Sequence, residues 1–500
     1  MTVEVKAEET QMAEVLVCEE EATKKVEKEV DETDLKKPRV VEKSSSYKEE
    51  SNFLSDLKEF EKKALIDLKT KLEEAIIGNS LYKKEEPKKN QKASEESAEE
   101  KKKPVKEEEG KEEKDTEKSA EEPKPEGDEN EKGGEKEENT NAGVQVKSEE
   151  IDRDISLWGV PLLPSKGAEG TDVVLLKFLR AREFKVNEAF EMLKKTLQWR
   201  KDSKIDFILD EELCVDLSSA AYANGVDREG HPVCYNVFGV FESEELYQKT
   251  FGTEEKRSQF LRWRCQLMEK SIQKLDLKPS GVSSLLHVND LKNSPGPSKK
   301  ELRIATKQAV GLLQDNYPEL VAKNIFINVP FWYYALNALL SPFLTQRTKS
   351  KIVIARPAKV TETLLKYIPA DEIPVQYGGF KRENNFDFYG DDSSVSELVL
   401  KAGVTETIEI PAPEVDSTLI WDLTVLGWEV NYKEEFVPSD EGSYTIIVQK
   451  GQKIGSQEGP LRNTYRSNEP GKVVLTIENT SNKKKRVLYR YKAKKSTASF

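Results

Sequence analysis

The stretch that decides the fold covers residues 317–355 and reads YPELVAKNIFINVPFWYYALNALLSPFLTQRTKSKIVIA. Its two short apolar runs, NIFINVP and KIVIA, have the length and composition of buried β-strands. Residues 331–344 between them are apolar nearly all round, but they are too few to span a bilayer as a helix. The stretch therefore predicts two buried strands that are connected through an apolar helix.

Two interpretations of this apolar helix are open. A helix without a polar face is either buried in protein or exposed to lipid. Taken alone, the segment favours an ordinary helix of the hydrophobic core.

The same alternation of strand and helix patterns extends upstream. The runs PVCYNVFGV and SSLLHVND are strand-like, and residues 255–275 and 299–315 have helical periodicity. Strands that alternate with helices form a largely parallel sheet with helices packed against it. We therefore predict an α/β domain over residues 216–385, preceded by a helical lobe over residues 151–215.

Four cations lie between the two helices predicted in this lobe, namely Lys177, Arg180, Arg182 and Lys185. They are compatible with a solvated helix face. Without further information, the solvated face is the favoured interpretation.

Residues 392–497 predict an antiparallel β-sandwich, because several short alternating strands are separated by turns. The segment KVVLTIENTSNKKKRVLYRYKA reads as a hairpin with a polar turn near residues 479–482. A group of cations follows this turn: Lys483, Lys484, Lys485 and Arg486. These residues either protect a sheet edge from aggregation or contact an anionic membrane.

The net charge of −13 arises in the first 150 residues. These hold 30 basic and 45 acidic side chains, whereas the remaining 350 residues hold 49 basic and 47 acidic ones. A segment that is so polar cannot bury enough apolar surface to fold, and residues 1–150 are predicted to be an acidic disordered tail.

Within this tail, residues 52–77 carry an apolar stripe at helical spacing. This stripe indicates either a marginal helix without a partner or a helix that docks on the body, another protein or a membrane.

The sequence has no recognisable motif for catalysis or for a cofactor. Its four cysteines are scattered, it has two histidines, and the Gly-rich phosphate loop, GxSxG and HExxH motifs are absent. We therefore expect no metal, no cofactor and no enzymatic activity. The first residues lack the features of a secretory signal, which favours the cytoplasm, and the near-neutral body argues against nucleic acid as a partner.

Three blocks of the sequence resemble known domains. LLKFLRAREFKVNEAFEMLKKTLQWRK resembles the helical N-lobe of CRAL-TRIO lipid-binding proteins. The stretch quoted first, together with LLKYIPADEIPVQYGG, resembles their lipid-binding lobe, and residues 395–495 resemble a GOLD domain, a β-sandwich of Golgi trafficking proteins. An acidic tail followed by these two domains is similar to the architecture of the plant patellins.

The resemblance implies a site for phosphoinositides. Matched by motif, the headgroup-binding residues would be Arg182, Glu319, Thr348 and Lys351. The apolar helix would be a gate over the lipid pocket rather than a core helix. Its gate and pocket residues would be Phe331, Trp332, Tyr334, Leu336, Leu339, Leu340 and Phe343.

Two positions depart from the family pattern. Glu183 stands where many members carry a second cation, which predicts a weaker or differently posed headgroup. Leu285 and His287 stand where the family has hydroxyl groups that contact phosphatidylcholine, so exchange of a choline lipid is not expected. His287 is expected to be a core residue rather than a ligand.

The function implied by the resemblance is that of a peripheral membrane protein in membrane trafficking, including cell-plate formation in cytokinesis. It would act at the plasma membrane, endosomes or cell plate. Its partners would be phosphoinositides and the anionic membrane surface, with proteins binding through the GOLD domain or the helix at residues 52–77. Two alternatives are a cytosolic carrier of another hydrophobic small molecule and a trafficking adaptor that binds proteins through the GOLD domain.

Overall fold

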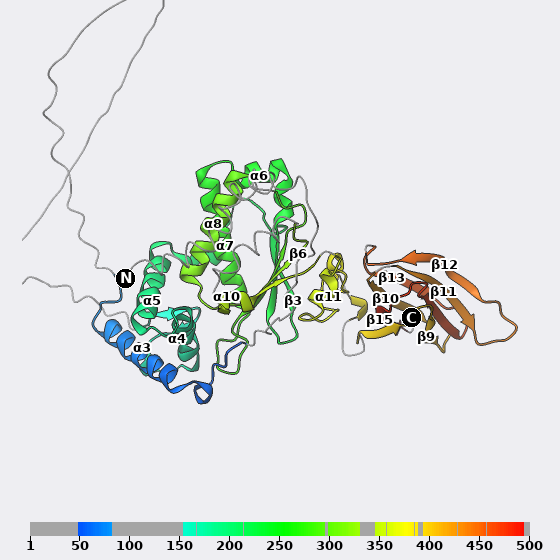
Figure 1. Ribbon diagram of the computed structural model, residues 1–500, viewed down its shortest axis with the longest axis horizontal. Coiled ribbons are helices and arrows are strands. Elements are labelled where there is room, and N and C mark those ends of the chain that lie inside the picture. The colour runs from blue at the N-terminus through cyan, green and yellow to red at the C-terminus, as the bar shows by residue number, and fades with distance from the viewer. Residues whose placement is uncertain are drawn as a thin grey trace, which may run out of the picture. The chain divides into compact units, whose positions relative to one another are not determined.

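The computed structural model describes residues 49–82 and 154–494, except residues 167, 214, 296–298, 331–345, 357, 385, 389–393, 428 and 457 and the side chains of Gln346 and Thr348. The described residues form a helical lobe, an α/β domain and a β-sandwich, as the sequence predicts (Figure 1). The segment predicted to be a gate helix, with all of its named gate and pocket residues, lies outside the described residues.

The helical lobe is built from three helices and a small hairpin. The helices are α3 (Glu59–Ile77), α4 (Glu169–Ala181) and α5 (Val186–Asp202), and the hairpin pairs β1 (Ser156–Leu157) with β2 (Val160–Pro161). Steps of three and four residues place Leu65, Leu68 and Leu72 on one face of α3, and this face joins the core of α4 and α5. The helix expected within residues 52–77 therefore forms, and it docks on the body.

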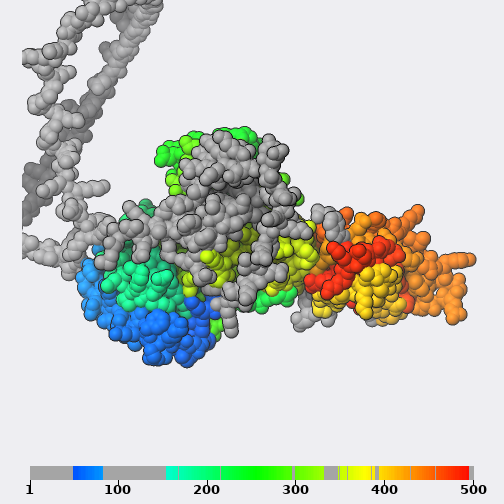
Figure 2. Space-filling view, in the orientation of Figure 1, coloured from blue at the N-terminus to red at the C-terminus, as the bar shows by residue number. Residues whose placement is uncertain are grey.

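Residues 49–82 thus belong to the folded unit of the chain rather than to the predicted tail over residues 1–150. Figure 2 shows them seated on the surface of the helical lobe. Average composition over residues 1–150 is dominated by charged residues and hides one apolar helix face. Moreover, the Glu- and Lys-rich residues 83–141 separate α3 from its packing partners along the sequence.

The α/β domain contains a five-stranded sheet in the order β3-β4-β5-β6-β7. β3 is antiparallel to β4, and all other neighbours are parallel. The strands are β3 (Ala221–Val226), β4 (Pro232–Val237), β5 (Leu285–Asp290), β6 (Val321–Ile327) and β7 (Ile352–Ile354). The helices are α6 (Glu244–Phe251), α7 (Glu254–Ile272), α8 (Lys300–Asn316), α10 (Gln346–Lys351) and α11 (Val360–Leu364).

Both faces of this sheet are covered. On one face, Met268 and Ile272 of α7 pack against Cys234 and Leu285. On the other, the segment that contains α11 packs against the remaining strand residues. Short 3-10 helices complete the described chain: Leu54–Asp56, Pro164–Lys166, Ile205–Asp210, Phe238–Glu242, Val375–Tyr377 and Phe386–Phe388.

The C-terminal domain is a sandwich of two antiparallel four-stranded sheets, in the orders β13-β10-β15-β8 and β12-β11-β14-β9. The strands are β8 (Ser396–Leu400), β9 (Thr405–Ala412), β10 (Thr418–Leu426), β11 (Val430–Pro438), β12 (Ile446–Ile454), β13 (Leu461–Arg466), β14 (Gly471–Glu478) and β15 (Lys485–Lys494). The inward residues of both sheets form one core around Trp421, Tyr432 and Phe436.

The predicted hairpin near residues 479–482 is wrong. β14 and β15 are consecutive strands, but they belong to opposite sheets. The buried Asn479 lies at the crossing, and its Nδ2 donates to the carbonyls of Lys401 at 2.9 Å and Lys483 at 2.8 Å. Alternation of apolar residues identifies a strand but not its partner, so the sequence pattern could not distinguish a hairpin from a crossing between sheets.

Candidate functional site

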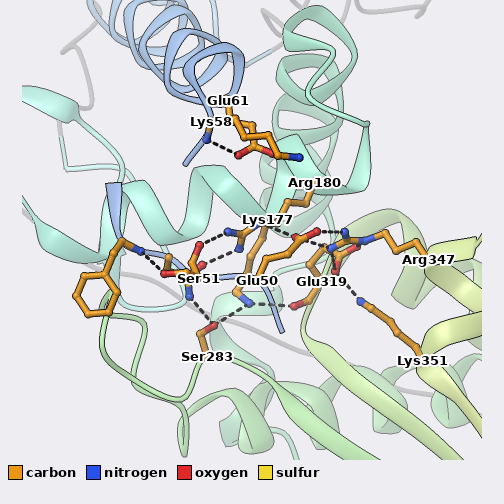
Figure 3. A network of polar contacts seen from close by, with 12 residues as sticks. Glu50, Ser51, Lys58, Glu61, Lys177, Arg180, Ser283, Glu319, Arg347 and Lys351 are labelled. Atoms are coloured by element: carbon orange, nitrogen blue, oxygen red, sulfur yellow. Dashed lines mark hydrogen bonds and ion pairs between the residues drawn. The ribbon is translucent and has the colours of Figure 1, made fainter. Parts of the chain in front are cut away.

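Four basic side chains converge where the helical lobe meets the α/β domain, and we call Lys177, Arg180, Arg347 and Lys351 the cation cluster (Figure 3). Lys177 and Arg180 lie three residues apart on α4, and Arg347 and Lys351 lie four apart on α10. Both spacings place a pair of side chains on one face of a helix. Two helices distant in sequence therefore turn their cationic faces toward one centre.

Glu319 lies at this centre, two residues before the start of β6 at Val321. Its carboxylate accepts hydrogen bonds from Arg347 at 2.8 and 3.0 Å and from Lys351 at 2.6 Å. Burial alone would raise the pKa of the Glu319 carboxyl, but the bond from Arg347 and the charge of Lys351 lower it to about 2. Its backbone is left-handed, with φ 54°, a conformation that costs a non-glycine residue about 1–3 kcal/mol and is common at functional sites.

Lys177 is almost completely buried. Its ammonium group donates to the carbonyl oxygen of Glu319 at 2.9 Å and to the hydroxyl of Ser283 at 3.3 Å. Burial lowers the pKa of Lys177 to about 8, although the charges of Glu49 and Glu319 partly offset this effect. Because both bonded acceptors are neutral groups, an added anion would stabilise this buried charge.

Residues 49–52, which we call the strap, run across the cation cluster from the start of the described chain. The Glu50 carboxylate contacts Arg347 at 2.6 Å and Arg180 at 3.0 Å. Arg180 also donates to the backbone carbonyl of Ser51 at 2.7 Å and to Oδ1 of Asn52 at 2.6 Å. The strap thus supplies three acceptors to a single guanidinium group.

A charged histidine holds the first residue of the strap. The two ring nitrogens of His231 lie 2.9 Å from Asp227 and 3.0 Å from Glu49. Burial alone would lower the pKa of His231, but hydrogen bonds to Asp227 and Glu49 raise it to about 9. Burial alone would raise the pKa of Glu49, but His231 and Lys177 help to lower it to about 2. At neutral pH, an imidazolium therefore links two carboxylates and ties the strap to the α/β domain.

This contact predicts a pH dependence. A raised pKa means that the stability from His231 is fully present below pH 6.5 and is lost as the pH rises through about 9. At pH 6, the free energy of unfolding of the wild-type protein should exceed that of the His231→Gln variant. At pH 10, this difference should be smaller by on the order of 2 kcal/mol. Urea unfolding of both proteins at each pH measures it. A difference independent of pH would mean that the imidazole is neutral in the folded protein.

Other charged groups near this histidine enter the same comparison. Glu229 lies 4.0 Å from His231, and Lys323 and Lys366 line a hollow of about 50 Å³ beside Glu49. Because the His231→Gln variant retains these groups, the difference between the two proteins reports mainly on the histidine.

The structure brings together some of the predicted headgroup residues. Glu319 and Lys351 lie at the centre of the cation cluster, whereas the side chain of Thr348 lies outside the described residues. Arg182 lies apart and donates to the neighbouring carbonyl of Ala181. It follows Arg180 by two residues, a spacing that turns it to another side of the chain.

Sequence reasoning missed three members of the cation cluster as binding residues. The sequence favours a solvated helix face for Lys177 and Arg180, and it carries no signal for Arg347. The spacing of Lys177 and Arg180 on one helix face was visible in the sequence. The position of Arg347 opposite that face depends on the packing of separate elements and was not visible.

The other predicted cations have different settings. Lys483 and Lys484 are exposed, Lys485 is buried, and Arg486 forms a bidentate pair with Glu397. Two of these four side chains are therefore directed to solvent, where a membrane could reach them. Burial lowers the pKa of His287 to about 3, so this residue is neutral.

The part of the chain that the structure describes lacks two features. Within it, no helix is both long and apolar enough to cross a bilayer. In the same residues, no group of three or more His, Cys, Asp or Glu side chains is placed to hold a metal ion.

Comparison with known proteins agrees with this architecture. The CRAL/TRIO domain matches residues 217–379, its N-terminal domain matches residues 111–195, and the patellin-1-like C-terminal GOLD domain matches residues 401–485. The chain is therefore a lipid-binding CRAL-TRIO protein with a GOLD domain. It is 58% identical to Patellin-4 of Arabidopsis thaliana over an alignment that covers the whole of both chains. The chain belongs to the patellin family.

Two other relatives are similar over shorter regions. Patellin-3 of Arabidopsis thaliana is 52% identical over 345 residues, which cover 68% of this chain and 69% of the relative. Phosphatidylinositol transfer protein SFH5 of Kluyveromyces lactis is 28% identical over 251 residues, which cover 49% of this chain and 80% of the relative.

Proposed function

We propose that the protein is a peripheral membrane protein that binds a phosphoinositide headgroup at the cation cluster. The convergence of four cations around Glu319 supports this proposal. Arg and Lys side chains form charge-assisted hydrogen bonds with phosphate oxygens, and a carboxylate can accept from inositol hydroxyls. The apolar residues 331–344 would close over the lipid tails, and the exposed Lys483 and Lys484 would add contacts with the membrane.

The resemblance to patellins extends the proposal to the cell. The protein would deliver or sense lipid during membrane trafficking, including formation of the cell plate in cytokinesis. It would associate with the plasma membrane, endosomes or cell plate. The name of the phosphatidylinositol transfer relative supports the choice of lipid class.

The Arg347→Gln/Lys351→Gln variant tests the site. Its affinity for phosphoinositide-containing vesicles is expected to fall by at least about tenfold, because it loses two cations that face the proposed headgroup. Sedimentation with vesicles of phosphatidylcholine and phosphatidylinositol phosphate measures the change. Unchanged binding would exclude the cluster as the headgroup site.

Two control variants make this test specific. Arg466→Gln/Lys472→Gln removes two cations from exposed pairs of the sandwich and should change binding much less. The Arg182→Gln variant distinguishes the site defined by the structure, which excludes Arg182, from the site defined by the family motif, which includes it. Binding unaffected by Arg182→Gln would support the cluster as defined here, whereas strong weakening would support the motif-based assignment.

A further inference from the structure

The strap presents an anion to the cation cluster. The Glu50 carboxylate bridges two guanidinium groups: Oε1 lies 2.6 Å from Nη1 of Arg347, and Oε2 lies 3.0 Å from Nε of Arg180 (Figure 3). Guanidinium N–H groups bind the oxygens of a phosphate as they bind those of a carboxylate. Glu50 therefore occupies the place where a headgroup phosphate would meet two strong donors.

The charge balance of the site depends on the strap. The cation cluster comprises four cations, and the carboxylate of Glu319 lies at its centre. The strap adds Glu50, which contacts Arg347 and Arg180, and Glu49, whose charge acts on the buried Lys177. Withdrawal of the strap would therefore leave three more cations than carboxylates, a balance suited to an anion with several charges.

The acidic end of the strap and the helix that follows the strap are held by different kinds of contact. The Glu50 and Arg347 side chains are 45% and 31% exposed, so water and salt weaken their ion pair. Asn52 is buried, and α3, which begins seven residues later at Glu59, is fixed by the apolar core of the helical lobe. The Glu50 carboxylate can therefore exchange with a ligand while the helix remains docked, whereas release of Glu49 also requires the loss of its 3.0 Å ion pair with His231.

From these contacts we propose that Glu49 and Glu50 act as an internal competitor for the cation cluster, which a phosphate-bearing headgroup displaces when it binds. This inference rests on the proposed headgroup site and describes how that site is regulated. The docked helix keeps both carboxylates at a high effective concentration. The apparent dissociation constant of a headgroup then increases as the fraction of protein molecules with a withdrawn strap decreases.

The full-length Glu49→Gln/Glu50→Gln variant tests the inference, because glutamine keeps the shape and hydrogen-bonding capacity of each side chain. Its affinity for vesicles that contain phosphatidylinositol phosphate should rise by at least about fivefold over wild type. In a second experiment, the affinity of both proteins for soluble inositol trisphosphate is measured. A gain with both probes locates the competitor at the headgroup site, whereas a gain with vesicles alone would show relief of membrane repulsion and would overturn the proposal.

A matched control separates local competition from net charge. The Asp67→Asn/Glu74→Gln variant removes two charges from exposed positions of α3. If both variants gain affinity equally, or if neither gains, the inference is overturned while the proposed headgroup site stands. If the wild type and the Glu49→Gln/Glu50→Gln variant both fail to bind either probe, the proposed function and the inference fail together.

A direct observation of the strap completes the test and does not depend on any variant. Hydrogen exchange of the wild-type protein is compared with and without saturating inositol trisphosphate. The amide of Phe53, which donates to Oγ of Ser51 at 3.2 Å, should exchange faster in the ligand-bound protein, while those of α3 should keep their protection. Equal protection of the Phe53 amide in both states would overturn the proposal.

Discussion

Replacement of Leu72 by alanine is expected to lower the free energy of unfolding of the helical lobe by about 3–5 kcal/mol. Leu72 is fully buried in the core that α3 shares with α4 and α5. The shorter side chain loses the transfer free energy of the removed groups and leaves a cavity that neighbouring residues fill only in part. Urea unfolding followed by circular dichroism measures the change.

Ile66 provides the matched control, because it is on the same helix but 62% exposed. Ile66→Ala should change the free energy of unfolding by no more than about 0.5 kcal/mol. Equal effects of the two substitutions would mean that α3 does not pack on the lobe in solution.

The docking of α3 also bears on the choice of fragments. A chain that begins at residue 150, the boundary indicated by charge, would lack this helix and expose the core it covers. Experiments on the lipid that copurifies with the protein therefore need residues 49–82 as well as the domains.

Much of the fold could be predicted because its signals are local. The runs NIFINVP and KIVIA overlap β6 and β7 of the central sheet. The alternating C-terminal strands form the predicted sandwich. Each of these elements is specified by residues close together in the sequence, so periodicity is sufficient to identify it.

The remainder depends on which elements meet, and periodicity does not specify this. α3 and α4 pack together although more than 90 residues separate Ile77 from Glu169. Arg347 reaches both Glu319 and Glu50, which lie on segments far apart in sequence. The strap was invisible for the same reason, since two adjacent glutamates in an acidic region carry no local signal of a cationic partner.

The second large effect is expected in the sandwich, at the buried Asp422. Its carboxylate accepts from Arg462 at 2.8 Å and from Arg490 at 2.8 Å. Both the Asp422 and the Arg490 side chains are almost completely inaccessible to water. Asp422→Ala should therefore destabilise the sandwich by about 3–5 kcal/mol, because it removes the carboxylate that compensates a buried guanidinium charge.

Arg466→Ala is the control, because it breaks an ion pair with Asp416 in which both side chains are more than half exposed. Such a pair contributes about 0–1 kcal/mol. Denaturant unfolding of the sandwich should separate the two variants clearly. Similar small losses would mean that water reaches Arg490 when its partner is removed. A large loss of stability for Asp422→Ala alone would show that the buried ion pair, rather than the number of ion pairs, stabilises this domain. The physical reason is that removal of one buried charge leaves the desolvation cost of its partner uncompensated.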